Sequence, residues 1–171
     1  STTDSLTGIL NRRAFQIAVE EELRGKTPGV FIFIDVDNFK IYNDTYGHDV
    51  GDLVLKEMAD IFSGLCEKQG FVCRYGGDEY IIVFFTADKE RLKETAKQIY
   101  QKIDQADGFE KAISEKLKKQ ISIRKEQRIS CSIGIVLAED IHGEEEIKQM
   151  IKRADDLLYS IKTTKKGTYR I

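Results

Sequence analysis

The chain has 171 residues, of which 41% are hydrophobic and 33% charged, a composition typical of one globular domain and unlike that of a disordered chain. Its formal net charge of −2 gives no electrostatic reason to expect contact with nucleic acid or an anionic membrane. No apolar run approaches the roughly 20 residues of a membrane-spanning helix. The first residue is not Met, so we expect residues 1–171 to be a single domain cut from a longer protein.

The three cysteines indicate a reducing environment. They form no CxxC pair and lie in apolar surroundings, at Cys66, Cys73 and Cys131. We expect buried free thiols rather than disulfides or zinc ligands, and a cytoplasmic location for this domain. A membrane anchor elsewhere in the full-length protein is left open.

Helix and strand patterns alternate along the first half of the chain. Asn11 is suited to cap a helix whose apolar stripe includes Phe15 and Val19. The apolar run 30–35 is too short for most helices and is expected to be a central strand. Apolar positions at helical spacing between residues 50 and 65 predict a long helix.

Two further strands, 71–74 and 80–85, flank a pair of glycines. We expect a tight two-residue turn there, in which Gly76 and Gly77 adopt positive φ without a Cβ clash. The elements expected after it are a helix over 92–103, a polar helix and loop over 107–127, a strand at 128–137, a helix at 144–161 and a strand at 167–171. Helices interleaved with one mixed sheet predict an α/β or α+β fold.

Acidic residues stand at the ends of two of these strands. Asp35 and Asp37 end the strand that begins at residue 30, and they point to the same side because side chains alternate with period two. Asp78 and Glu79 come directly before the strand 80–85. If the two strands are neighbours, Asp35 and Asp78 come within reach of one ion. Mg²⁺ commonly binds through one or two carboxylates plus substrate phosphates.

A short helix that follows the first of these strands offers an anion site. Asn38, Phe39 and Lys40 enter this helix, whose free backbone N–H groups could hold a phosphate together with the Lys40 ammonium. Metal-binding carboxylates beside such a cradle suit a nucleoside triphosphate and phosphoryl or nucleotidyl transfer. The sequence contains no G-x-x-x-x-G-K-[ST] loop, which excludes a P-loop NTPase.

Each of these features also has a purely structural interpretation. Asp35 and Asp37 could cap the helix that follows, and Asp78 could be a polar residue flanking a hairpin. His48 has no partner at metal-ligand spacing and is expected to be a structural or surface residue. Three carboxylates at the ends of apolar strands are harder to explain as solvated surface than one pair alone, which favours the metal site.

Residues 74–80, RYGGDEY, resemble the signature of the GGDEF family of diguanylate cyclases. Similar motifs follow one another over nearly the whole chain, at residues 4–13, 33–40, 43–52, 130–135 and 154–162. The resemblance implies a central mixed, largely antiparallel sheet wrapped by helices, similar to the palm of nucleotide cyclases and polymerases. It also implies a reaction that joins two GTP molecules into cyclic di-GMP and releases two pyrophosphates.

The resemblance also implies roles for individual residues. Asp35, Asp78 and Glu79 would be catalytic, and with the Val36 carbonyl they would form the site of Mg²⁺ or Mn²⁺. Residues implied in substrate binding are Asn43 and Asp52 for guanine, and Asn38, Phe39, Lys40, Lys162 and Lys166 for the terminal phosphates. The implied partners are GTP, a second identical domain for catalysis and an upstream sensory domain.

The sequence departs from the family pattern at four positions. Tyr80 replaces the phenylalanine of the signature and is expected to preserve strand packing. Lys166 stands where the family has arginine, which keeps the charge but loses the bidentate fork. Glu67 and Gly70 occupy the ends of the family's R-x-x-D product-inhibition motif, so we expect that inhibitory site to be absent.

Two alternatives to an active cyclase remain open. One is a weak or inactive GTP-binding regulatory domain, although the chain retains every signature carboxylate. The other is a cyclase of relaxed specificity that makes other cyclic dinucleotides. Asp52 argues against the second alternative, because the promiscuous branch of the family looks altered at that position.

Overall fold

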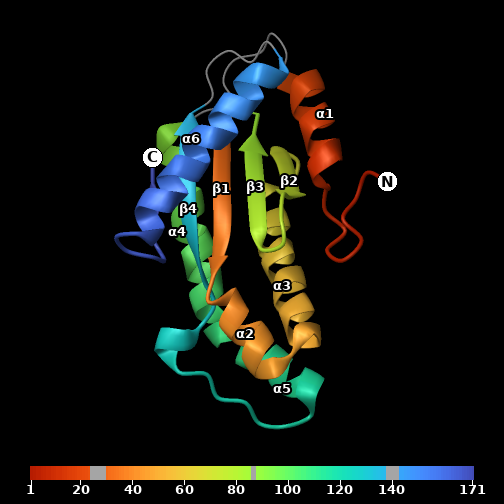
Figure 1. The fold of residues 1–171 in the computed structure, drawn as a ribbon, viewed down its shortest axis with the longest axis vertical. Coiled ribbons are helices and arrows are strands. Elements are labelled where there is room, and N and C mark those ends of the chain that lie inside the picture. Colours follow the sequence, from red (N-terminus) through yellow and green to blue (C-terminus); the bar gives the residue numbers. More distant parts are fainter. Residues whose placement is uncertain (24–29, 86–87, 138–142) are drawn as a thin grey trace.

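The apolar run that begins at Val30 forms the central strand of a five-stranded sheet (Figure 1). The computed structural model describes residues 1–23, 30–85, 88–137 and 143–171. The strand order is β2-β3-β1-β4-β5, with every neighbouring pair antiparallel except β4 and β5. The strands are β1 (Val30–Asp37), β2 (Gly70–Arg74), β3 (Glu79–Phe84), β4 (Ser130–Leu137) and β5 (Tyr169–Arg170). The expected mixed, largely antiparallel sheet is confirmed.

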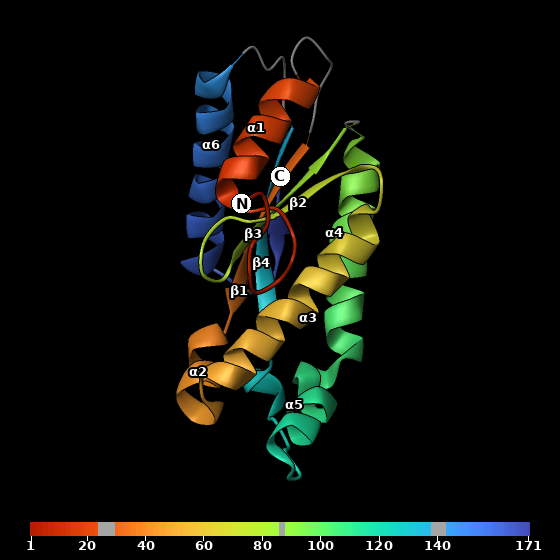
Figure 2. The same cartoon turned by 90° about the vertical axis from the view of Figure 1, so that its right-hand side faces the viewer.

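Helices cover both faces of this sheet, as Figure 2 shows. Helices α1 and α6 pack on one face, and α3, α4 and α5 belong to the core on the other. The helices are α1 (Arg12–Leu23), α2 (Phe39–Tyr46), α3 (His48–Cys66), α4 (Lys89–Gln105), α5 (Glu110–Leu117) and α6 (Glu144–Lys162). Two short 3₁₀ turns, Asp107–Phe109 and Lys125–Gln127, flank α5 and the loop that follows it.

The sheet separates two hydrophobic cores, one on each face, because successive side chains of a strand point to opposite faces. In β1, Ile32, Ile34 and Val36 face α3 and α4, whereas Phe33 faces α1 and α6. Coverage of both faces suits the unbroken apolar stretch of β1 from Val30 to Ile34, which the sequence predicts to be a central strand. The three cysteines are buried free thiols, as expected. No helix in the described ranges is long and apolar enough to span a membrane.

The expected two-residue turn at the glycines is wrong. Four residues connect β2 to β3, and neither Gly76 nor Gly77 adopts positive φ. The backbone N–H groups of Tyr75 and Gly76 both donate to the Glu79 carbonyl, which closes a wider loop without left-handed residues. A Cβ at Gly76 would meet the Glu79 carboxylate, so a larger residue there would have to displace the end of that side chain.

Tyr80 preserves strand packing, as expected, and adds a polar contact. Its side chain is fully buried, and its ring meets Phe62 edge to face with centroids 5.0 Å apart. The hydroxyl donates to the Leu55 carbonyl of α3 over 2.8 Å. The residue that departs from the family signature therefore joins β3 directly to α3.

A close approach of α6 to the sheet carries the end of that helix to the end of β1. A Cβ at Gly134 would lie 2.7 Å from the Ala154 carbonyl oxygen and 3.2 Å from Leu157 Cβ, so only glycine allows this packing. The last residue of α6 is Lys162. This position at the helix terminus brings its ammonium group to the carboxylates described below.

Candidate active site

Three carboxylates meet where β1 ends and β3 begins. Asp35 lies directly opposite Glu79 in the register of these strands, and Asp78 immediately precedes Glu79. The Val36 N–H donates to the Asp78 carbonyl over 3.1 Å, which holds the two chain segments side by side. The condition for a shared ion site, that these two strands be neighbours, is therefore met.

The environment of these groups opposes negative charge. Burial raises the pKa of Asp78, and the neighbouring charge of Asp35 raises it further. Burial also raises the pKa of Glu79, with repulsion from Asp35 and Asp78 as further causes. Burial raises the pKa of Asp37 in the same way. A positive charge placed among these side chains would stabilise their charged forms against both burial and mutual repulsion.

Lys162 supplies one such charge. Its ammonium group donates to the Asp35 carboxylate and forms an ion pair with it. Partial burial lowers the pKa of Lys162, but the hydrogen bond and charge of Asp35 outweigh this and raise it overall. A lysine at the end of α6, 127 positions from Asp35 in the sequence, thus partly neutralises the carboxylates.

The same residues fit a hard divalent cation. No group of three or more Cys, His, Asp or Glu side chains within the described ranges is arranged to hold a metal by itself. Mg²⁺ does not require such a cage, because substrate phosphates and water complete its shell. Asp35 and Asp78 offer carboxylate oxygens. The Val36 carbonyl points to the same neighbouring strand as the Val36 N–H, toward Asp78.

A pocket of about 400 Å³ opens beside Asp78. Asn43 and Asp52, the expected guanine-binding residues, both line it. The Asn43 Oδ1 atom is buried and has no hydrogen-bond partner in the described part of the chain. Gly51 packs so closely against the Asn43 amide that a Cβ there would overlap it. The remaining lining residues are Phe39, Lys40, Asp44, His48, Leu55, Arg74 and Gly77.

The residues expected to bind phosphate do not all lie in this pocket. Asn38 adopts a left-handed conformation (φ 67°), and its amide donates to the carbonyls of Glu126 and Arg128. Lys40 is exposed and pairs with Asp44 at 3.0 Å. Lys162 is engaged by Asp35, and Lys166 is exposed. Of these expected residues, Phe39 and Lys40 line the pocket, whereas Asn38, Lys162 and Lys166 do not.

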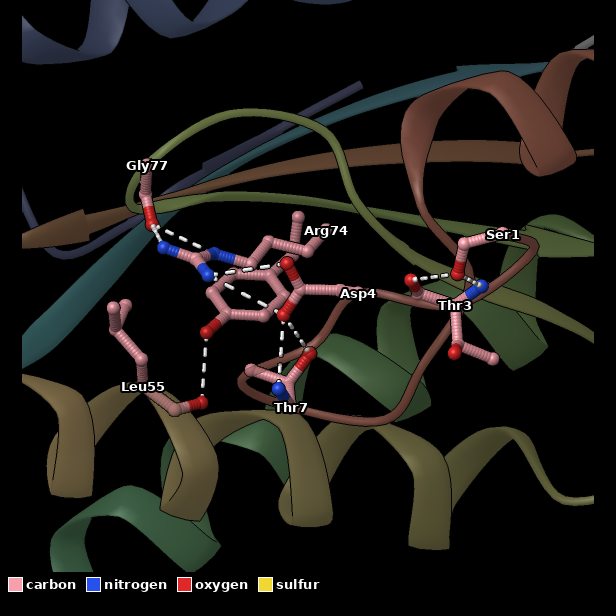
Figure 3. Close-up of polar contacts among 8 residues, drawn as sticks. Ser1, Thr3, Asp4, Thr7, Leu55, Arg74 and Gly77 are labelled. Atoms are coloured by element: carbon pink, nitrogen blue, oxygen red, sulfur yellow. Dashed lines mark hydrogen bonds and ion pairs between the residues drawn. The ribbon is translucent and has the colours of Figure 1, made fainter.

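Arg74 is a site residue that sequence reasoning missed. Its Nε and Nη2 donate to the Gly77 carbonyl at 3.0 and 2.8 Å, and its Nη1 contacts both carboxylate oxygens of Asp4 (Figure 3). Asp4 in turn accepts from the N–H and hydroxyl of Thr7. Burial acts to raise the pKa of Asp4, but Thr7 and Arg74 lower it overall. The arginine two positions before the glycine pair was the available signal.

Asp37 and His48 also have positions that the sequence did not reveal. Asp37 is buried and accepts from the Ser132 hydroxyl at 2.8 Å and the Gly167 N–H at 3.2 Å. It therefore fastens the C-terminal loop to the sheet. His48 is exposed, as expected of a surface residue, but lines the pocket.

We expect Asp78→Asn to increase the free energy of unfolding of the metal-free protein near pH 7. A carboxyl whose pKa is raised by folding binds its proton more tightly in the folded state, so its ionisation destabilises that state. The gain should shrink as the pH falls to about 4 and below, because the wild-type Asp78 carboxyl then becomes protonated in both its folded and its unfolded state. Mg²⁺ should stabilise the wild type more than the variant.

Urea denaturation at both pH values, with and without Mg²⁺, measures these differences. Asp60→Asn, at an exposed position of α3, is the matched control. A variant no more stable than the wild type near pH 7 would show that the Asp78 charge is already compensated in the folded protein.

Comparison with known proteins places this chain in a family. The family model described as "Diguanylate cyclase, GGDEF domain" matches residues 1–168. Diguanylate cyclase DosC from Escherichia coli (strain K12) is 33% identical over 172 residues, covering 98% of this chain and 34% of DosC. The chain therefore spans about a third of the length of DosC.

Solved structures agree with this assignment. The GGDEF domain of TpbB, also named YfiN, from Pseudomonas aeruginosa matches with a TM-score of 0.76 and 27% identity, covering 98% of this chain and 92% of that one. The active GGEEF domain of a diguanylate cyclase from Vibrio cholerae matches with a TM-score of 0.72 and 28% identity, covering 93% and 94%. The chain belongs to the diguanylate cyclase GGDEF-domain family.

Proposed function

We propose that this domain is a diguanylate cyclase, which condenses two GTP molecules into cyclic di-GMP and releases two pyrophosphates. The observation that carries the proposal is that Asp78, which lies beside Asp35, lines the same pocket as Asn43 and Asp52. Carboxylates suited to a metal and polar groups suited to a base are thus adjacent. The names of its relatives support the same reaction.

Asp35, Asp78 and the Val36 carbonyl would hold Mg²⁺ or Mn²⁺, with Glu79 beside them. When bound, the metal would lower the pKa of the ribose 3′-hydroxyl and neutralise charge on the α-phosphate. Glu79 is the residue we assign to accept the hydroxyl proton, because its raised pKa makes it a better base than an ordinary carboxylate. The 3′-oxygen then bonds to the α-phosphorus, and pyrophosphate leaves.

The remaining residues would bind and orient GTP. Asn43 and Asp52 hydrogen-bond the guanine. Phosphate binding is assigned to the backbone at Asn38 and Phe39 and to the lysines Lys40, Lys162 and Lys166. Lys162 would exchange its carboxylate partner for a phosphate, because the metal would then supply the positive charge that Asp35 now receives from the lysine.

Each domain holds one GTP, yet the product needs two 3′-hydroxyls that attack two α-phosphates. A two-fold pairing of identical domains satisfies both attacks with one sequence. Specific activity should therefore rise with enzyme concentration, and a parallel leucine zipper fused ahead of Ser1 should increase it through a higher effective concentration. Constant specific activity of a demonstrated monomer over about a hundredfold dilution would refute the two-copy mechanism.

Incubation of the purified domain with GTP and Mg²⁺, followed by mass analysis, tests the reaction directly. We expect cyclic di-GMP from the wild type and none from Asp35→Asn, since the substitution removes a charged ligand at nearly constant volume. The conservative control is Asp60→Asn, which should retain activity. GTP binding without turnover would instead indicate a regulatory domain, and products containing adenine would indicate relaxed specificity.

Asp52→Ser should weaken the preference for GTP over ATP. Asp52 would accept from guanine N1–H and N2–H₂, whereas adenine has no proton on N1 and no 2-amino group, so ATP would lack these two hydrogen bonds. Competition between GTP and ATP measures the change, with Asp60→Ser on the same helix as control. Unchanged selectivity would mean that other residues read the base.

A further inference from the structure

The helix that carries Asn43 is held in place by a distant part of the chain. Helix α2 has eight residues and lies at the end of the sheet, beside α5 and the segment that follows α5 (Figures 1 and 2). Residues 107–129, which we call the brace, include α5 and both 3₁₀ turns. The brace is hydrogen-bonded to the side chains of Tyr42 in α2 and of Asn38, the residue that precedes α2.

Tyr42 makes the more buried of these contacts. Only 1% of its surface is exposed. Its hydroxyl donates to the Gly108 carbonyl at 2.9 Å and accepts from the Ile129 N–H at 3.2 Å, so it joins both ends of the brace. Burial raises the pKa of Tyr42 to about 12, which keeps the hydroxyl protonated and able to donate.

The brace adopts a costly backbone conformation at this contact. Asp107, Gly108 and Phe109 all have positive φ, at 49°, 70° and 64°. Left-handed conformations are unfavourable for residues other than glycine and persist where surrounding structure enforces them. A Cβ at Gly108 would lie 2.7 Å from the Tyr42 hydroxyl oxygen, so the glycine is needed for this close approach. Both partners are therefore suited to this contact, the brace by its backbone conformation and Gly108, and α2 by the buried Tyr42 hydroxyl.

The other contacts reinforce the attachment. The Asn38 amide donates to the carbonyls of Glu126 and Arg128, within and next to the second 3₁₀ turn. The Arg128 guanidinium lies 3.5 Å from Asp107 and 3.9 Å from Glu110, which ties that turn to the first. Both ends of the brace thus converge on one face of α2.

This attachment bears on the pocket because Asn43 follows Tyr42 directly. The Asn43 side-chain amide packs against Gly51 of α3, and the Asn43 backbone carbonyl accepts from the Gly47 N–H at 2.9 Å. A shift of α2 would therefore change where the Asn43 amide stands relative to Asp52 on α3. The brace limits such a shift from the opposite side of α2.

We propose that Tyr42 is a positioning residue for nucleotide binding: its hydroxyl, held between Gly108 and Ile129, fixes α2 so that Asn43 is presented to the pocket. The proposal rests on the proposed function, because it takes that pocket to be the GTP site. Tyr42 itself touches no substrate and acts through Asn43. The brace would then contribute to affinity and base selectivity without lining the pocket.

Tyr42→Phe tests this inference, with Tyr100→Phe as the matched control. Tyr100 also uses its hydroxyl to join distant elements, donating to the Cys131 carbonyl at 3.1 Å, but it does not line the pocket. We expect Tyr42→Phe to weaken GTP binding and raise KM about fivefold, the ratio that corresponds to one lost hydrogen bond. It should also narrow the preference for GTP over ATP, with kcat nearly unchanged. Tyr100→Phe should change neither binding nor selectivity.

Calorimetric GTP titration, steady-state kinetics and urea denaturation on both variants separate the outcomes. A Tyr42→Phe protein that loses stability but keeps wild-type KM and selectivity would overturn the proposal, because its hydroxyl would then be only structural. Equal KM increases in both variants would overturn it as well. A wild-type domain that binds no GTP would instead refute the proposed function on which the inference rests.

Discussion

Repulsion among carboxylates packed at one end of the sheet is the constraint on which the site depends. The pairing of β1 with β3 forces Asp35, Asp78 and Glu79 together in a partly buried place, where burial and mutual repulsion raise the pKa of Asp78 and Glu79. Such a cluster is tolerable only beside positive charge. Lys162 provides that charge in the structure, and a divalent cation with a nucleotide would provide more of it.

The order of the strands explains why the functional groups share one end of the molecule. Because β1 is antiparallel to both neighbours, its last residues lie beside the start of β3 and the start of β4. Asp37, buried near the start of β4, then holds the Gly167 N–H of the loop that follows α6. Close packing of α6 on Gly134 delivers Lys162 to the same end. Antiparallel pairing and one tight helix–sheet contact thus assemble the cluster.

Two sets of contacts hold the glycine loop and α2 from outside the pocket. Arg74 grips the Gly77 carbonyl and is itself held by Asp4, so the N-terminal segment positions the glycine loop. On the other side, Tyr42 and the brace hold α2. Both sets consist of buried or partly buried polar contacts between distant segments. These contacts stabilise the site only while both partners keep their positions. A precise pocket can therefore be made from a short loop and an eight-residue helix.

By itself, the sequence determined the helices and strands, the carboxylates at two strand ends and the family, because these follow from local periodicity and motif spacing. Only the tertiary structure decided how the glycine loop is closed, since two hydrogen bonds to the Glu79 carbonyl, rather than positive φ, hold its ends together. The pairing of Lys162 with Asp35 and of Tyr42 with Gly108 joins residues 127 and 66 positions apart. Contacts of that range depend on how whole elements pack, which no local pattern encodes.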